Sequence, residues 1–206
     1  MDLLSIVIVN WNSSDFAVDC IASLHATTTD VPFEVIVVDN ASTENVSRIV
    51  DVHPGVRLLA SHQNLGFARA NNLGVEQSQG RWILFLNPDT IVLKNAIRVM
   101  LSNLESHAEV GAVGCRLLNG DMTLQMSSVQ RFPTILNQLL SLDVLKRRWP
   151  KARLWGTSAL FTDSPVAVDV VSGACLMVKR EVFEQAGRFS PDYFLYHEDT
   201  DLSLRL

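Results

Sequence analysis

The most restrictive feature of this sequence is the apolar run from Trp82 to Leu86, which stops abruptly at Asn87–Asp89. An unbroken apolar run this short is typical of a β-strand covered on both faces, and it is far too short to span a membrane. Pro88 cannot continue strand pairing, so we expect the strand to end before it. Asn87 and Asp89 then lie at the carboxyl end of a buried strand, where open α/β sheets bind ligands, although the same residues also form simple turns.

Three more predicted strands lead into polar residues in the same way. We expect them at 3–9, 33–38 and 56–60, with helices between them at 15–24 and ending at Gln77. This alternation predicts a largely parallel sheet with right-handed crossovers. The carboxyl ends of parallel strands share one edge of the sheet, so four polar groups should converge there. The pattern favours a ligand site over four independent turns; the groups are Asn10–Ser13, Asp39–Ser42, Asn64–Asn72 and Asn87–Asp89.

The second half of the chain is less regular. We expect a helix at 95–104, a strand at 110–113, a hairpin turn at 119–121, a strand at 166–171 and a short helix at 179–185. The segment 135–155 combines apolar residues with five basic side chains, Lys146, Arg147, Arg148, Lys151 and Arg153. Such a segment is typical either of peripheral contact with an anionic membrane or of a core-packed helix whose basic end complements its dipole.

Composition narrows the classes of protein. The chain has 206 residues, of which 48% are hydrophobic and 19% charged, enough for one sizeable core, and its net charge of -5 argues against a nucleic-acid partner. The cysteines Cys20, Cys115 and Cys175 show no metal-binding spacing, and we expect them to be reduced and buried. Because the sequence lacks signal-peptide features and a membrane-spanning run, we expect a cytoplasmic protein.

The end of the chain places acidic groups among aromatic ones. His197, Glu198, Asp199 and Asp201 follow the aromatic run 193–196. The pattern indicates either a helix start favoured by acidic residues or an acid/base site whose carboxylate pKa values are raised because the aromatic rings limit water. The predicted helix is still in progress at Leu206, so we expect the sequence to be truncated at its C-terminal side.

Taken together, these segments resemble one known family. The matching stretches, in order along the chain, are Val7–Asn12, Val37–Ser42, Asn64–Asn72, Leu86–Asp89, Ser172–Ala174 and His197–Asp201. The chain resembles family 2 glycosyltransferases of the GT-A fold, in particular bacterial rhamnosyltransferase-like members. The resemblance implies one α/β domain over 1–206, with a Rossmann-like, mostly parallel sheet flanked by helices. Residues 1–115 would form the nucleotide-sugar-binding half, and 116–206 a smaller, mixed acceptor and catalytic half.

The resemblance also implies a reaction. A sugar, rhamnose being one candidate, would move with inversion from a UDP- or dTDP-sugar to a cell-surface polysaccharide or a lipid-linked acceptor. Asp89 would bind Mg²⁺ or Mn²⁺ at the family's Asp-x-Asp position, where Asn87 replaces the first acid and so weakens the metal affinity. By the same resemblance the nucleotide-sugar would be bound by Val9, Asn10, Asn12, Asp39, Asn40, Ser42, Asn64, Gly66, Phe67, Asn71 and Asn87.

Asp199 corresponds to the family's candidate catalytic base, and Glu198 would assist it. Gly173 and Asp201 would lie on the acceptor side. These residue types suit the chemistry, since a departing nucleoside diphosphate gathers charge that a cation neutralises while a base deprotonates the acceptor hydroxyl. A catalytically silent nucleotide-sugar-binding domain is the main alternative, favoured by Asn87. A nucleotidyltransferase is less consistent, because 10–14 is not a glycine-rich phosphate loop.

Overall fold

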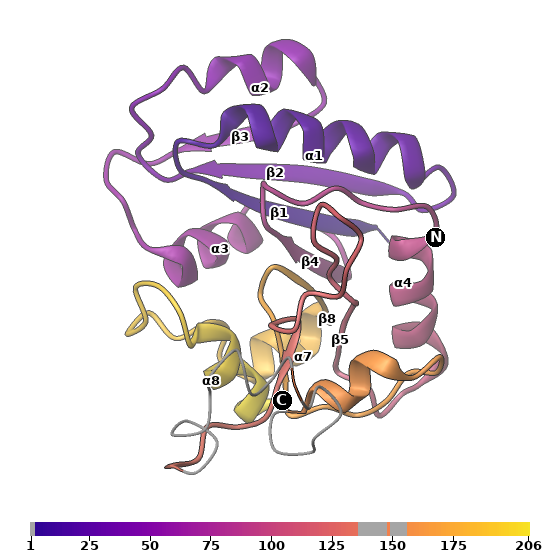
Figure 1. Ribbon diagram of the computed structural model, residues 1–206. Helices are drawn as coiled ribbons and strands as arrows, with labels where there is room; N and C mark the ends of the chain where they lie inside the picture. Colours follow the sequence, from indigo (N-terminus) through magenta and orange to yellow (C-terminus); the bar gives the residue numbers. More distant parts are fainter. Residues whose placement is uncertain (1–2, 136–147, 149–155) are drawn as a thin grey trace.

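The computed structural model describes residues 3–135, 148 and 156–206, and its centre is a single twisted sheet (Figure 1). The sheet has six strands in the order β3-β2-β1-β4-β8-β5. Nearly all of the basic segment 135–155 lies outside the described residues, so membrane contact through it stays a prediction. None of the helices in the described part of the chain is long and apolar enough to cross a membrane.

The first half follows the predicted alternation of strands and helices. Strands β1, β2, β3 and β4 are mutually parallel. In the β1–β2 register Asn10 lies opposite Asp39, which brings the polar carboxyl ends to one edge. The elements are β1 Leu4–Asn10, α1 Ser14–Thr27, β2 Phe33–Asp39, α2 Ser47–Val52, β3 Arg57–Ala60, α3 Phe67–Glu76, β4 Trp82–Leu86 and α4 Ala96–Ser106.

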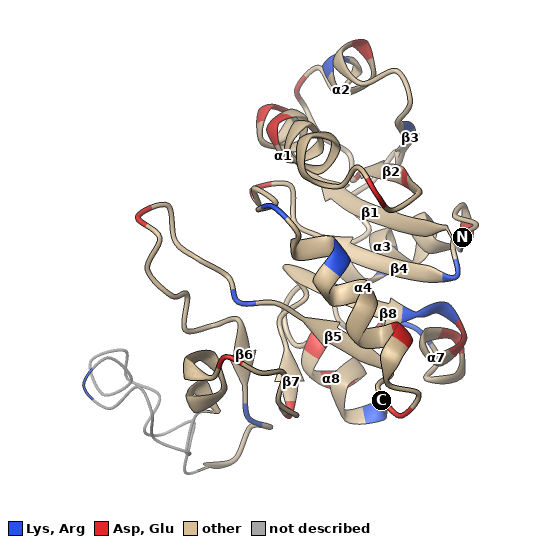
Figure 2. Cartoon of the chain, turned by 90° about the vertical axis from the view of Figure 1, so that its right-hand side faces the viewer, with Lys and Arg blue, Asp and Glu red and all other residues tan. Residues whose placement is uncertain are grey.

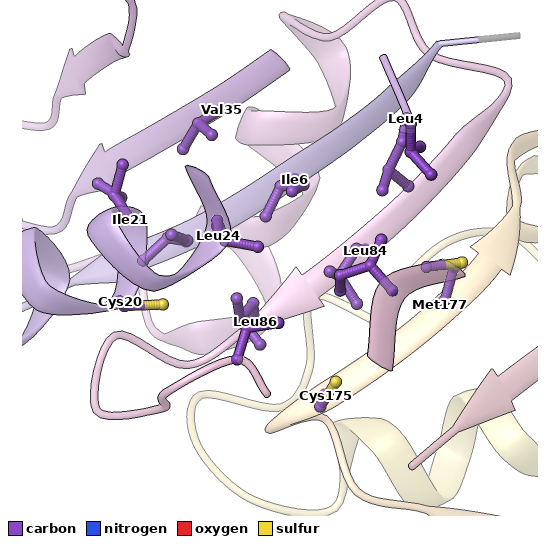
Figure 3. Close-up of a cluster of buried hydrophobic side chains, with 14 of the residues drawn as sticks. Leu4, Ile6, Cys20, Ile21, Leu24, Val35, Leu84, Leu86, Cys175 and Met177 are labelled. Atoms are coloured by element: carbon purple, nitrogen blue, oxygen red, sulfur yellow. The ribbon is translucent and has the colours of Figure 1, made fainter. Parts of the chain in front are cut away.

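The apolar run Trp82–Leu86, which forms β4, is buried on both faces as predicted. Its alternate residues Trp82, Leu84 and Leu86 pack into a cluster with side chains of α1 and α4, part of which is shown in Figure 3. Ile83 and Phe85 point into a second cluster formed with α3 and α7. Because each fully buried large apolar side chain contributes roughly 1.5–3 kcal/mol, the two layers fix β4, and with it the loop that follows.

The second half extends the sheet with antiparallel pairs. Strand β8 runs antiparallel between β4 and β5, which is the main departure from a parallel sheet. Strands β6 and β7 form a separate two-stranded sheet. In Figure 2 acidic and basic segments are interspersed along α2, α7 and α8, whereas α1 carries acidic segments alone. The elements are β5 Ala112–Gly114, β6 Val129–Gln130, the 3-10 helix η1 Thr157–Phe161, β7 Val170–Val171, β8 Cys175–Lys179, α7 Arg180–Gln185 and α8 Glu198–Arg205.

Two local expectations for this half have different outcomes. The turn at 119–121 is confirmed: the Met122 N–H donates to the Asn119 carbonyl at 2.8 Å, and Leu118 and Leu124 form a single antiparallel bridge. The strand expected at 166–171 is wrong in extent, because only its last two residues pair. The Asp169 carboxylate instead accepts the Phe132 N–H at 3.2 Å, which ties this stretch down outside the ladder.

Candidate functional site

The polar carboxyl ends of β1 and β2 are joined by side-chain hydrogen bonds. Asn10 is fully buried, and its Nδ2 donates to Asp39 Oδ1 at 3.2 Å and to Ser42 Oγ at 3.1 Å. The Asn40 backbone N–H continues the link by donating to the Asn10 carbonyl at 2.8 Å. The predicted convergence of these groups is therefore confirmed, and each group also holds a neighbouring loop in place.

Asn12 connects the same two loops further out. Its backbone N–H donates to Ser42 Oγ at 2.9 Å, and its Oδ1 accepts the Thr43 N–H at 2.8 Å. Asn12 has a left-handed backbone, with φ of 51°. An Asn side chain that bonds its neighbours suits such a turn. Asn12 and Ser42 thus shape the β1–α1 loop, whatever else they contact.

The N-terminus of α1 is capped by a residue from the facing loop. Ser13 is the N-cap residue, but it makes no side-chain capping bond. Glu44, which follows β2, instead accepts the Ser14 N–H at 2.8 Å and the Ser14 hydroxyl at 2.6 Å. These bonds lower the pKa of the Glu44 carboxyl. The capping acceptor of this helix is therefore the Glu44 carboxylate, which takes the first-turn N–H, and not a serine side chain.

The Asn64–Gly66 loop is folded back onto the end of β2 by Asn40. Asn40 Nδ2 donates to Asn64 Oδ1 at 2.9 Å, and Asn40 Oδ1 accepts the Leu65 N–H at 2.7 Å. Asn64 Oδ1 also accepts the Gly66 N–H at 2.9 Å. This brings the loop to the same sheet edge as Asn10 and Asp39.

Two residues proposed for nucleotide binding turn away from this edge. Asn71 is 1% exposed, and its Nδ2 donates to the Phe67 carbonyl one turn earlier in α3 at 3.0 Å. Val9 packs its side chain against the apolar cluster on the α3 face, so it offers only its backbone to a ligand. Asn71 thus stabilises the first turn of α3.

The loop after β4 presents Asp89 to solvent. Among the described residues, no group of three or more His, Cys, Asp or Glu side chains could hold a metal ion. Mg²⁺ and related cations are commonly bound by one or two carboxylates together with phosphate oxygens and water. A lone exposed carboxylate therefore fits a cation shared between the protein and a diphosphate, and it does not fit a preformed metal site.

Asp199 lies in the first turn of α8 and is held by backbone donors. Its Oδ2 accepts the Gly173 N–H at 3.1 Å, and its Oδ1 accepts the Thr200 N–H at 2.7 Å. Immediately after Gly173, the Ala174 carbonyl accepts the Asn87 N–H at 2.9 Å. The segment 172–174 therefore contacts both Asp199, which was expected to act as the base, and the loop that carries Asp89, which was expected to bind the metal.

The two acidic neighbours of Asp199 have different surroundings. Glu198 is only 6% exposed, and its Oε2 has no hydrogen-bond partner in the part of the chain that the structure describes. Burial raises the pKa of its carboxyl. Asp201 forms an ion pair with Arg205 in the next turn, at 2.6 Å. Glu198 thus has one buried carboxyl oxygen without a hydrogen-bond partner among the described residues, whereas Asp201 is already paired within its helix.

The aromatic residues before Glu198 do not shield the site, and that expectation is wrong. Phe194 and Tyr196 are 59% and 71% exposed. Sequence reasoning missed the main-chain attachment of this segment: the Phe194 carbonyl accepts the Phe67 N–H at 2.8 Å. Gly66, at φ of 77°, makes room for it, since an added Cβ would lie 2.4 Å from the Phe194 oxygen. The glycine in the Asn64–Gly66 loop was the only available signal.

Comparison with known proteins gives a consistent result. A family model described as glycosyl transferase family 2 matches residues 5–187. An N-acetylglucosaminyl-diphospho-decaprenol L-rhamnosyltransferase of Mycobacterium tuberculosis is 30% identical over 100% of this chain and 70% of its own length. The rhamnosyltransferase WbbL of Escherichia coli is 26% identical over 99% of this chain and 76% of its own length.

Solved structures show the same fold. The mannosyltransferase PcManGT of Pyrobaculum calidifontis, in complex with GDP-Man and Mn²⁺, superposes with a TM-score of 0.66 at 18% identity over 97% of this chain. TarS residues 1–349 of S. aureus, in complex with UDP-GlcNAc, superpose with a TM-score of 0.65 at 19% identity over 100% of this chain. The chain spans about half the length of these two proteins, 50% and 53%.

Proposed function

The chain belongs to glycosyl transferase family 2, and from this premise we propose that it transfers a sugar from a nucleotide-sugar to a saccharide or lipid-linked saccharide acceptor. The named relatives make rhamnose the first sugar to test. The observation that carries the proposal is the segment 172–174, which holds Asp199 at one end and the Asp89-bearing loop at the other. Displacement at an anomeric carbon needs a base for the acceptor hydroxyl and charge neutralisation at the diphosphate. Asp199 and Asp89 are proposed to supply these two functions, and the segment 172–174 contacts the first residue and the loop of the second.

The sugar donor is proposed to lie along the edge formed by the β1, β2 and Asn64 loops. The hydrogen bond between Asn10 and Asp39 fixes the ends of β1 and β2 at this edge. The hydrogen bonds of Asn12, Ser42 and Asn64 fix the loops that follow. Such a site is largely formed before the ligand arrives, so less ordering entropy is lost on binding. The base and ribose would occupy this region, and the diphosphate would extend towards Asp89.

In the chemical step Asp199 is proposed to take the proton from an acceptor hydroxyl. The acceptor oxygen then forms a bond to the anomeric carbon as the bond to the diphosphate oxygen breaks, and the nucleoside diphosphate leaves with that electron pair. Attack from the side opposite the leaving group inverts the anomeric configuration. The Gly173 and Thr200 N–H groups fix the direction of the carboxylate, which favours productive contact with the hydroxyl.

Asp89 is proposed to hold Mg²⁺ or Mn²⁺ together with the diphosphate. When bound, the cation neutralises charge that develops on the departing diphosphate. Asn87, whose backbone is fixed by Ala174, sets the position of the loop. With a single carboxylate, metal affinity should be low without nucleotide and should rise when the diphosphate supplies further oxygen ligands.

Calorimetry with UDP and dTDP in Mn²⁺ or in EDTA tests the metal assignment. The wild type should bind nucleotide more tightly in Mn²⁺, and Asp89→Ala should abolish only that increment. Asp121→Ala is a matched control, because this exposed carboxylate bonds within its own turn. Equal wild-type affinity in Mn²⁺ and EDTA would show that Asp89 holds no bridging cation.

The transfer reaction itself is tested by product analysis with radiolabelled sugar donors. Labelled UDP- and dTDP-sugars are incubated with a lipid-linked saccharide, and the label is followed into the acceptor. Label moving to the acceptor with release of nucleoside diphosphate supports the transferase. Sugar-donor binding without transfer, across the panel, supports the catalytically silent domain instead.

A further inference from the structure

Two cysteines distant in sequence meet at the edge of the main sheet. The β5–β8 ladder pairs Val113 with Met177 and Gly114 with Leu176. One further step along this antiparallel register places Cys115 opposite Cys175. Residues directly opposite in antiparallel strands have Cα atoms about 4.5–5.5 Å apart, which lies within the range of about 4.4–6.8 Å that a disulfide requires.

The two thiols, of Cys115 and Cys175, differ in exposure and in pKa. Cys175 is buried, and its sulfur lies 3.9 Å from Met100 Sδ, whereas Cys115 is half-buried. Direct interaction between the two thiols lowers the pKa of Cys115 and raises that of Cys175. The third cysteine, Cys20, has its pKa raised to about 11 by burial. Since the thiolate is the reactive form, Cys115 is the best nucleophile of the three.

We propose that Cys115 and Cys175 form a site of reversible oxidative modification, at which a peroxide converts the two thiols into a disulfide. The Cys115 thiolate attacks one peroxide oxygen, the O–O bond breaks, and a sulfenic acid and water result. The Cys175 sulfur then attacks the sulfenic sulfur and releases a second water. Two thiols and one hydrogen peroxide thus give one disulfide and two waters, and a dithiol reductant reverses the reaction.

The position of the bond couples it to the site. Cys175 directly follows the segment 172–174, which holds both Asp199 and Asn87. The backbone next to Cys115 is tightly packed, because a Cβ added at Gly114 would lie 2.0 Å from Val171 Cγ1. Fixing the two sulfurs at a bond length of about 2.05 Å should therefore restrain the start of β8 and the Gly173 N–H with it. Oxidation should reduce sugar transfer; this consequence rests on the proposed function, but the disulfide does not.

The bond is tested on the full chain with hydrogen peroxide, followed by thiol titration under denaturing conditions. The free thiols should fall from 3, the number of cysteines in the sequence, to one. The mass should fall by two hydrogen atoms, and proteolysis should give a linked peptide containing Cys115 and Cys175. Cys115→Ser should form no such peptide, while Cys20→Ser, which keeps an oxygen beside Thr90, should still form it. No linked peptide, or linkage through Cys20, would overturn the proposal.

The consequence for function is read from the same samples. Peroxide should lower transfer several-fold in the wild type and in Cys20→Ser, and dithiothreitol should restore it, whereas Cys115→Ser should be insensitive. A disulfide that leaves transfer unchanged would overturn the coupling to Asp199. If no preparation transfers sugar, the proposed function fails, and the linked peptide still decides whether the disulfide exists.

Discussion

The two sides of the site are built in different ways. At the ends of β1 and β2, side chains bind side chains: Asn10 bonds Asp39 and Ser42, and Asn40 bonds Asn64. Around Asp199 the donors are two backbone N–H groups, of Gly173 and Thr200, and the Thr200 hydroxyl at 3.3 Å, and the nearby rings of Phe194 and Tyr196 are exposed. The side proposed to bind the nucleotide is thus a network of polar side chains, whereas the position of Asp199, the proposed base, depends on the path of the main chain.

This difference predicts different sensitivities. A substitution in the polar network removes one or two hydrogen bonds, each with a net value of about 0.5–1.5 kcal/mol, and leaves the loops nearly in place. On the catalytic side a small shift of the main chain moves the reacting group itself, and a misplacement of about 1 Å can cost on the order of 10²-fold in rate. The largest effects on turnover should therefore come from Asp199 and from the residues that set its backbone.

Asp199→Asn should have the largest effect on turnover. The amide keeps the size of the side chain but loses the basicity, so sugar transfer should fall by about 10²–10⁴-fold. The affinity for the sugar donor should stay near wild type, because the polar network at Asn10 and Asp39 is untouched. Turnover and donor affinity are measured on the same preparation.

Asp201→Asn is the matched control for this experiment. Asp201 is paired with Arg205 in the same helix, and removing such a partly exposed pair should cost about 0–1 kcal/mol of stability and little turnover. If Asp199→Asn lowers sugar transfer as little as Asp201→Asn does, Asp199 only stabilises α8 and is not the base. If Asp201→Asn alone abolishes transfer, the acceptor side is centred on Asp201.

Gly66→Ala should have the next largest effect, and it tests the main-chain link between the halves. The new methyl group would lie 2.4 Å from the Phe194 oxygen at a φ of 77°, so the segment leading to Asp199 must move. We expect kcat to fall by about 10²-fold while KM for the sugar donor changes little. Gly55→Ala is the control, because its added Cβ would meet no atom within 4 Å. A rise in KM alone would place the function of Gly66 on the nucleotide side.

The sequence contained enough information to predict the nucleotide half. Continuous apolar runs such as 82–86 identify strands without tertiary context, and parallel topology then brings Asn10, Asp39 and Asn64 to one edge. The convergence of these polar residues at one edge of the sheet was therefore predictable, but their hydrogen-bond partners were not. Whether Asn12 bonds a ligand or Thr43, and whether Asn71 faces the site or its own helix, depends on side-chain directions that periodicity does not specify.

The half that carries Asp199, the proposed base, was less predictable for a physical reason. Its positions are fixed by contacts between backbone groups distant in sequence, such as the Phe194 carbonyl with the Phe67 N–H. Backbone groups are common to all residues, so apart from Gly66, which makes room for this contact, they leave no trace in the pattern of side chains. The aromatic run at 193–196 was expected to limit water around the carboxylates that follow it, yet attachment through its main chain leaves Phe194 and Tyr196 exposed.

Glu198→Gln should change stability by a modest amount and in the favourable direction. Burial raises the folded-state pKa of Glu198 above its unfolded value. The charged form therefore destabilises the fold at neutral pH, and this cost disappears as the pH falls below about 4.3, the ordinary value for Glu. Removing the charge should raise the unfolding free energy at pH 7 by about 1 kcal/mol, with no gain at pH 4. Urea unfolding at both pH values measures it.

The activity of the same variant decides whether the buried carboxyl serves catalysis. A gain in stability together with a loss of transfer is typical of a residue retained for function. A gain in stability with full transfer would remove Glu198 from the proposed catalytic group and leave Asp199 alone. Reduced stability at pH 7 would mean that the Glu198 carboxylate has a stabilising partner.

Glu44→Gln should have the smallest effect, and it should lower the unfolding free energy where Glu198→Gln raises it. The hydrogen bonds from Ser14 lower the folded-state pKa of Glu44, so its contribution to stability is present above the unfolded value and is lost as the pH falls through the lower folded value. Gln keeps an acceptor for the Ser14 N–H but loses the charge at the N-terminus of α1. Because this exposed group is screened by solvent, the loss at pH 7 should be about 0.3–1 kcal/mol at low ionic strength. Urea unfolding should show the difference at pH 7, a smaller one in high salt, and none once the wild-type carboxyl is protonated. A loss that persists in acid would show that Glu44 acts through its shape and not through its charge.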